Sequence, residues 1–185
     1  MAALSTWAPE DGLLGAVAPL GLAVVRHTAL VIDLDEHGPP YPGSMTLARL
    51  VESGPRRADL EPRRRGTALL ANGGIGVDDA SDVLAALVAG WPDVVMRLPA
   101  RDARRAVPFG AALVPFRLLL PVDLVATPPA AAVWQSTGWR VRPPGPGPVL
   151  PRPSAATVAA LLGGVRPGPA RWLRRMRTVW EHPWW

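Results

Sequence analysis

Two carboxylates and a histidine at alternate positions are the clearest candidates for chemistry in this sequence. Asp33 and Asp35 close the apolar run that begins at Thr28, and His37 follows them. Because alternate residues of a strand point to the same side, these three side chains could converge on a metal ion. Carboxylates at the end of a strand more often accept hydrogen bonds from the backbone of the next loop, and we favour that interpretation. The sequence therefore predicts neither a catalytic nor a metal site.

The absence of two residue types excludes several classes of reaction. All 20 residues of the Lys+Arg count are arginine, and the chain has no cysteine. Without lysine there is no ammonium for the β- and γ-phosphates of a nucleotide, no Schiff base and no lysine general base. Without cysteine there is no disulfide, thiol catalysis or thiolate metal site. No two of the three histidines are four residues apart, and no serine lies in a nucleophile-elbow pattern, which argues against a helical metal pair and a serine hydrolase.

The formal net charge of +5 is unevenly distributed along the 185 residues. Residues 1–100 hold 8 Arg and 12 acidic residues, whereas residues 101–185 hold 12 Arg and 3 acidic residues. Such an imbalance can mark contact with nucleic acid, an anionic membrane or an acidic protein face. It is equally typical of a coding bias toward Arg, with a basic but merely solvated surface. Hydrophobic residues make up 49% of the chain, which predicts a folded core.

A basic amphipathic helix is predicted near the end of the chain, from about residue 169 to residue 182. At 100° per residue its apolar and basic side chains fall on opposite faces. Such a helix can dock on a partner protein or lie on an anionic membrane, or it can pack on the chain's own sheet with its arginines in solvent. The candidate partner- or membrane-binding residues are Arg171, Trp172, Arg174, Arg175, Met176, Arg177 and Trp180.

The first two thirds of the chain alternates apolar β-branched runs with helix-like segments, the pattern of a parallel α/β sheet with flanking helices. Strands are expected at 2–7, 28–33, 66–71, 93–98 and 116–122. Helices are expected at 11–26, at 45–53 after an N-cap at Ser44, at 78–90 and at 100–105.

A change of composition divides the chain into three predicted parts. Residues 1–127 form the α/β domain, residues 128–153 form a proline-rich arm or linker, and residues 154–185 form a C-terminal helical segment. The middle part holds eight prolines, which favours an extended conformation. A short edge strand at 134–141 is the exception expected within it. The next helix, at 154–164, begins with a serine cap and ends with two glycines.

Three segments resemble, in their order and spacing, the ParA/MinD group of P-loop ATPases, which includes chromosome-partitioning, septum-site-determining and pilus-assembly proteins. Residues 22–35 are similar to that family's first crossover helix and the strand that closes in Asp-x-Asp. Residues 36–50 are similar to the loop and helix after that strand. Residues 91–99 are similar to its aromatic-Asp strand that ends in proline. The resemblance covers roughly residues 1–127 and implies a degenerate P-loop NTPase-like fold.

The sequence departs from this family at the positions that would handle nucleotide. The family has a glycine-rich loop with two lysines, whereas residues 5–15 contain no lysine and carry Glu10 and Asp11, which reverse the charge of a phosphate site. The magnesium-associated Asp of the family corresponds to Arg97. Asp33 and Asp35 stand where the family places carboxylates of the nucleotide site. We therefore expect Asp33, Asp35 and Arg97 to mark a vestigial site, with no ATP hydrolysis and no cofactor.

The resemblance implies a pseudo-ATPase that acts as an interaction or regulatory module in cell division, chromosome positioning, or pilus or secretion assembly. One alternative is a small nucleotide- or metabolite-binding enzyme at the Asp33 and Asp35 edge of the sheet. Another is a nucleic-acid-binding protein that uses the basic C-terminal part. A protein partner is expected, with an anionic membrane or nucleic acid as alternative partners, and self-association stays open.

The start of the chain lacks a basic region ahead of its first apolar run, so no secretory signal is expected. The long uncharged stretches are interrupted by proline and are too short to cross a bilayer. We expect a cytoplasmic protein, with peripheral contact to the inner face of the membrane as the alternative.

Overall fold

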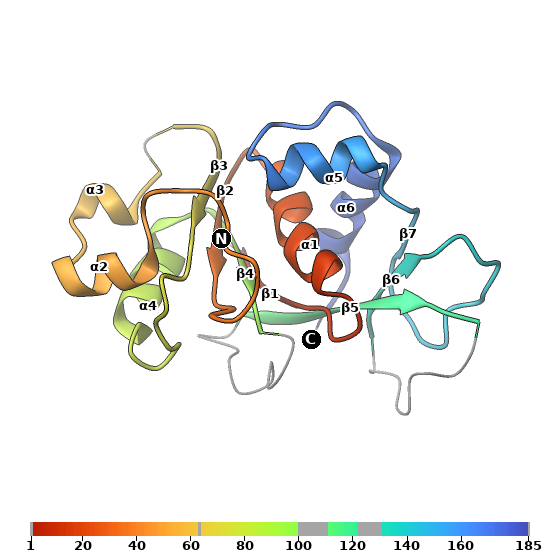
Figure 1. The fold of residues 1–185 in the computed structure, drawn as a ribbon, viewed down its shortest axis with the longest axis horizontal. Helices are drawn as coiled ribbons and strands as arrows, with labels where there is room; N and C mark the ends of the chain where they lie inside the picture. Colours follow the sequence, from red (N-terminus) through yellow and green to blue (C-terminus); the bar gives the residue numbers. More distant parts are fainter. Residues whose placement is uncertain (1, 63, 100–110, 122–130, 185) are drawn as a thin grey trace.

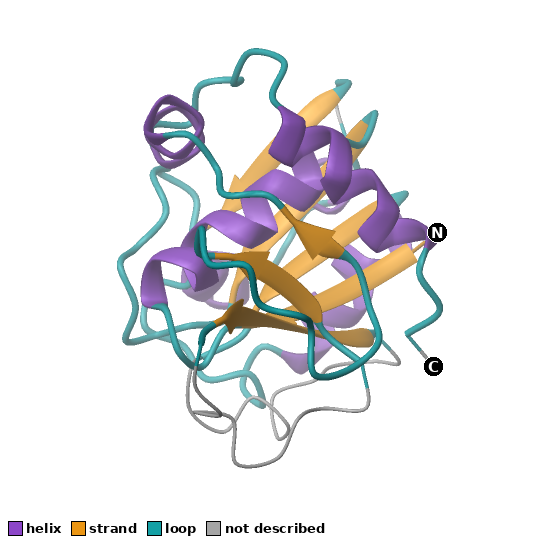
Figure 2. Cartoon of the chain, turned by 90° about the vertical axis from the view of Figure 1, so that its right-hand side faces the viewer, coloured by secondary structure: helices purple, strands orange, loops and turns teal. Residues whose placement is uncertain are grey.

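The computed structural model describes residues 2–62, 64–99, 111–121 and 131–184. The described residues form a seven-stranded sheet in which every pair of neighbouring strands is parallel (Figures 1 and 2). The order across the sheet is β3-β2-β4-β1-β5-β6-β7. The strands are β1 (Ala2–Trp7), β2 (Thr28–Asp33), β3 (Gly66–Leu70), β4 (Asp93–Arg97), β5 (Ala112–Leu119), β6 (Val133–Ser136) and β7 (Val149–Leu150).

Helices cover both faces of the sheet, with α1, α5 and α6 on one face and α2 and α4 on the other (Figure 1). This explains why β2 is apolar at consecutive positions: Ala29 and Val31 pack toward α1, whereas Leu30 and Ile32 pack toward α2 and α4. The helices are α1 (Gly12–Val24), α2 (Leu47–Ser53), α3 (Arg57–Leu60), α4 (Ser81–Gly90), α5 (Ala155–Leu162) and α6 (Arg171–Glu181).

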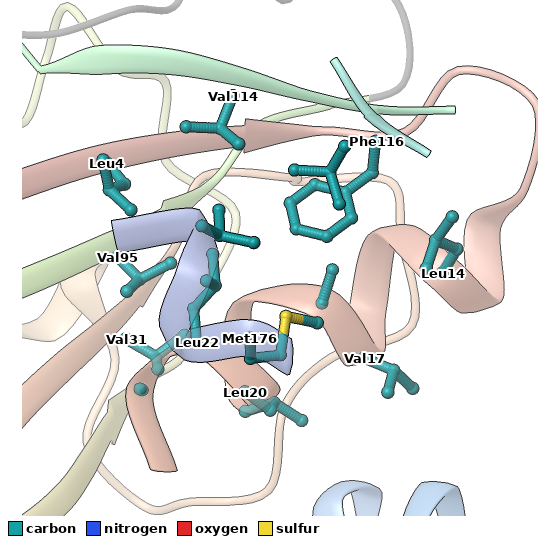
Figure 3. Packing of buried hydrophobic residues seen from close by; sticks show 14 of the residues in the cluster. Leu4, Leu14, Val17, Leu20, Leu22, Val31, Val95, Val114, Phe116 and Met176 are labelled. Carbon is teal, nitrogen blue, oxygen red and sulfur yellow. The ribbon is translucent and has the colours of Figure 1, made fainter. Parts of the chain in front are cut away.

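Helix α6 closes the core on the α1 side. Trp172 is 1% exposed, and its indole Nε1 donates a hydrogen bond to Oε1 of Gln135 in β6 at 2.8 Å. The ring lies so close to α1 that a Cβ added at Gly21 would be 2.5 Å from it. Figure 3 shows Met176 beside Leu22 of α1, in the cluster that includes the sheet residues Val114 and Phe116. The amphipathic stripe seen in the sequence is thus the face that α6 buries on its own chain.

The predicted parallel α/β sheet with flanking helices is confirmed, and most differences concern where elements begin and end. The N-cap of α2 is Thr46, not Ser44, because the Thr46 hydroxyl accepts the Arg49 N–H. Helix α4 begins at Ser81, after the predicted caps at 78–79, and β5 begins four residues before the predicted strand at 116–122. Helix α3 was not predicted, and the helix expected at 100–105 lies outside the described residues.

The segment predicted as a proline-rich arm, residues 128–153, contributes two strands among its described residues. Strand β6 pairs with β5, and β7, which was not predicted, pairs with β6, so the proline-rich segment extends the main sheet. Trp134 anchors it, since the buried indole donates to the carbonyl of Gly145 at 3.1 Å. β6 is therefore an interior strand and not the edge strand that the sequence suggested.

Across the described part of the chain, no helix combines the length and apolar character needed to span a bilayer.

Candidate functional site

The charged residues singled out in the sequence meet at one edge of the sheet, where the strands reach their carboxyl ends. Arg97, the last residue of β4, is in register with Asp33 at the end of β2 and with Thr6 near the end of β1. The loop from β1 to α1 carries Glu10 and Asp11 at the same edge. In open α/β sheets this edge is the usual place for a ligand, so the arrangement of these charges determines what could bind.

Arg97 lies between the two aspartates and contacts both. Its Nη2 is 2.9 Å from Oδ2 of Asp35, and its Nη1 is 3.4 Å from Oδ2 of Asp33. The same Nη1 donates a hydrogen bond of 2.8 Å to the carbonyl of Pro39. The three side chains are 3% exposed for Arg97, 1% for Asp33 and 12% for Asp35. Arg97, Asp33 and Asp35 therefore form one buried, internally paired cluster.

The remaining oxygens of the aspartates hold the loop after β2. Asp33 accepts a hydrogen bond from the N–H of Asp35 at 3.1 Å, and Asp35 accepts from the N–H groups of His37 and Gly38 at 3.3 and 3.0 Å. This confirms the interpretation that these carboxylates cap the loop. Gly38 lies so close to Arg97 and Asp35 that a side chain there would clash with both. In the described residues, no group of three potential ligands could hold a metal ion.

Tyr41 forms a wall of this cluster that the sequence did not reveal. The guanidinium carbon of Arg97 is 5.3 Å from the centre of its ring, and the Tyr41 hydroxyl donates to the carbonyl of Ala16 in α1 at 2.7 Å. Burial raises the pKa of Tyr41, although the charge of Arg97 opposes this. The phenol thus joins the loop after β2 to α1 and stacks on the arginine.

Burial also perturbs one of the aspartates. The pKa of Asp33 rises from 3.8 to about 6, because loss of hydration outweighs the attraction of Arg97 and the hydrogen bond from the Asp35 backbone. A carboxyl with this pKa could in principle exchange a proton near neutral pH. Its oxygens, however, already contact Arg97 and the backbone of the loop.

The loop between β1 and α1 supplies its own anion to the helix. The Asp11 carboxylate accepts hydrogen bonds from the N–H groups of Leu13 and Leu14, at 2.8 and 3.1 Å. It therefore occupies the backbone donors that a helix N-terminus can offer to phosphate. Glu10 pairs with Arg117 of β5. Arg117 is 9% exposed and was not singled out in the sequence, since nothing marks an isolated arginine in an apolar strand as the partner of a distant loop.

The seven predicted contact residues of α6 differ in burial and fall into three groups. Trp172 and Met176 are buried in the core, so the prediction that they face a partner or a membrane is wrong for these two side chains. Trp180 is half-buried; its indole donates to the carbonyl of Leu22 at 3.1 Å, and its ring lies 5.0 Å from the guanidinium of Arg26. The exposed members of the set are Arg171, Arg174, Arg175 and Arg177.

Comparisons with known proteins give a likeness of fold. No protein-family model matches the sequence, and no curated protein matches it. Among solved structures, the chain is similar to a ParA family ATPase from Chlorobium tepidum TLS, with a TM-score of 0.69 and 10% sequence identity over 98% of each chain. At this identity the likeness concerns architecture alone. The parallel seven-stranded sheet with helices on both faces is an α/β P-loop NTPase-like fold.

Proposed function

We propose that this protein is a non-catalytic, ParA-like interaction or regulatory module. In this proposal, charged side chains of the chain itself occupy the edge of the sheet at which a ParA-type ATPase would bind nucleotide. The observation that carries the proposal is the buried cluster in which Arg97 contacts both Asp33 and Asp35. A magnesium ion held by carboxylates would need oxygens that this arginine already engages.

The state of the α1 N-terminus supports the same conclusion. Phosphate binds at such a position because unpaired N–H groups and a nearby cation converge on its oxygens. Here the Asp11 carboxylate takes two of those N–H groups, and Arg117, which contacts the same loop, is already paired with Glu10. A bound polyphosphate would displace this carboxylate and lie close to a second one, Glu10.

The alternative of an enzyme at the Asp33 and Asp35 edge receives less support. A general base or a metal ligand needs a carboxylate oxygen that can reach substrate. One oxygen of Asp33 and one of Asp35 accept from the loop backbone, and the other oxygen of each faces Arg97. Substrate would have to break a buried ion pair before any chemistry began.

Calorimetric titration with MgATP and MgADP tests the nucleotide part of the proposal. We expect no saturable binding that depends on the Asp33 edge, and no phosphate release above a protein-free control. The variant Asp33→Asn serves as the matched comparison. Nucleotide binding that disappears in Asp33→Asn would contradict the proposal and favour the enzyme alternative.

The exposed arginines of α6 are the surface that we propose for a protein partner, in a setting of cell division, chromosome positioning, or pilus or secretion assembly. Deleting the helix would remove Trp172 and Met176 from the core, so a truncated chain would test folding rather than binding. Affinity capture should instead compare the intact chain with Arg171→Glu/Arg175→Glu, which changes exposed residues only. Proteins lost with this variant and kept with Arg140→Glu/Arg142→Glu would support the proposal. An identical set of captured proteins would contradict it.

A further inference from the structure

A cleft lies at the opposite edge of the sheet, where β2 and β3 begin. Thr28 and Gly66 are paired there, and the residues just before them are Arg26 and His27 on one strand and Arg64 and Arg65 on the other. The N–H of Gly66 donates to the carbonyl of His27 at 3.0 Å. This hydrogen bond holds the segment before β3 next to the segment before β2.

The cleft is a cavity of about 560 Å³, a volume typical of small-molecule sites. Its floor is apolar and its rim is basic. The cavity is lined by residues from four segments: the end of α1, the start of β3, the end of α5 and the loop after α5. The floor includes Leu20, Val24, Leu69 and Leu161, and the rim includes Arg26, Arg64, Arg65 and Arg166.

A second cavity of about 530 Å³ adjoins the first along the loop between α5 and α6. The two cavities share Val24, Arg26, His27 and Arg166, and the second continues toward Arg174 and Arg177. Among the described residues that line the two cavities there is no aspartate or glutamate. The whole region therefore attracts anions.

Most of these arginines have no carboxylate partner. Arg26 is the exception: it forms a two-pronged pair with Asp93, through Nε at 2.8 Å and Nη2 at 3.1 Å, and it stacks on Trp180. Within the described ranges, Arg64, Arg65, Arg166, Arg174 and Arg177 form no ion pair. Three uncompensated guanidinium groups thus surround the first cavity, while Arg26 is held in place by its own partners.

We infer that this cleft binds a small organic phosphate, with the phosphate on the arginine rim and an apolar or aromatic body on the floor. Guanidinium groups form paired hydrogen bonds with phosphate oxygens, and several of them favour a ligand with more than one negative charge. The apolar floor distinguishes this ligand from a bare phosphate ion. The limited volume of the cleft, about 560 Å³, suits a small ligand better than an extended polyanion, which would need a long basic ridge.

The first test uses 1-naphthyl phosphate, inorganic phosphate and 1-naphthol as calorimetric probes of the intact chain. We expect saturable binding of 1-naphthyl phosphate, with an affinity at least about tenfold higher than that of inorganic phosphate or of 1-naphthol. The double variant Arg65→Gln/Arg166→Gln should weaken this binding about tenfold or more. The control Arg140→Gln/Arg142→Gln changes exposed arginines outside the cleft and should bind as the original chain does.

The same titrations define what would overturn the inference. Absence of saturable binding, equal binding of inorganic phosphate, or binding unaffected by Arg65→Gln/Arg166→Gln would each contradict it. A duplex DNA probe that displaces 1-naphthyl phosphate, binds more tightly and weakens steeply with salt would instead assign the surface to nucleic acid. Thermal melts of both double variants should match that of the original chain, because all four residues are exposed.

This inference is independent of the proposed loss of nucleotide chemistry, and one comparison separates the two. ATP is itself an organic phosphate and could enter the cleft. Binding of ATP that is lost in Arg65→Gln/Arg166→Gln but kept in Asp33→Asn would support the cleft and leave the proposed function intact. Loss in Asp33→Asn alone would contradict the proposed function and leave the cleft without support.

Discussion

Arg97 stands directly across from Asp33 in the parallel register of β4 and β2, and the side chains of these two buried residues are in contact. A buried ion pair contributes little net stability when intact, because both charges lose hydration. Its loss is costly when one partner is removed and the other stays charged. Any arrangement of this edge that leaves Asp33 or Arg97 buried without its partner is therefore disfavoured.

The variant Arg97→Met should be destabilised in a pH-dependent way. At pH 8 it leaves the buried carboxyl groups of Asp33 and Asp35 without their cationic partner, and we expect a loss of about 3–5 kcal/mol in the free energy of unfolding. At pH 5 the loss should be clearly smaller, because Asp33 then takes up a proton. Urea denaturation at the two pH values measures this. Arg97→Lys, which keeps a positive charge near Asp33, should lose less at pH 8, and an equal loss at both pH values for Arg97→Met would contradict the prediction.

The ionisation of Asp33 should itself make the protein less stable as the pH rises. Its folded pKa of about 6 lies above its ordinary value of 3.8, so between these values the folded state binds more protons than the unfolded state. The contribution of Asp33 is thus most favourable below about pH 4 and declines by about 3 kcal/mol as the pH rises through about 6. The free energy of unfolding of the original chain should fall relative to that of Asp33→Asn over this range. A constant difference between the two would refute the assignment.

Gly21 should tolerate no side chain while Trp172 is present. Gly21→Ala normally favours a helix, but here the new Cβ would lie 2.5 Å from the Trp172 ring and 3.2 Å from the Met176 side chain. We expect a net loss of about 1–3 kcal/mol from overpacking. In the background Trp172→Leu the same change should cost much less, since the ring is gone. Thermal or urea denaturation of the four proteins in this cycle gives the coupling, and additive effects would show that the two residues do not press on each other.

The cap of α1 should contribute to stability as well as occupy the anion position. Asp11→Ala removes the acceptor of two backbone N–H groups and should cost about 0.5–2 kcal/mol. Asp11→Asn and Asp11→Ser keep an acceptor and should cost less. If the alanine variant were as stable as the original chain, these contacts would not hold the helix.

The sequence was sufficient for the parts of the fold that follow from local pattern. The continuous apolar run Thr28–Asp33 predicted a strand buried on both faces, and the serine at 154 predicted the start of α5. Asp33 and Asp35 were identified by their alternate spacing at the end of a strand, and Arg97 was identified through the family resemblance. Their mutual contact could not be read from the sequence, because it depends on β4 lying next to β2 in the sheet.

Features that depend on distant partners were missed for the same reason. Strand β7 has two residues and forms only because β6 offers an edge to it. The apolar face of α6 has the same periodicity whether it meets a membrane, a partner or its own core, and only the contact of Trp172 with Gly21 and Gln135 distinguishes these cases. Tyr41 lay in a turn-rich segment with no pattern to mark it as buried. The basic cleft required the starts of two strands and a loop after α5 to come together.

The packing of α6 on α1 also has a consequence for biosynthesis. The hydrogen bond between Trp180 and Leu22 joins positions 158 residues apart, and Trp172 and Met176 cover the same helix. Because α1 leaves the ribosome long before α6 has been translated, the apolar face of α1 that α6 later covers lacks this partner while the intervening residues are synthesised. Vectorial folding of this chain therefore passes through a nascent state with an exposed hydrophobic surface, the kind of surface that makes folding intermediates prone to aggregation.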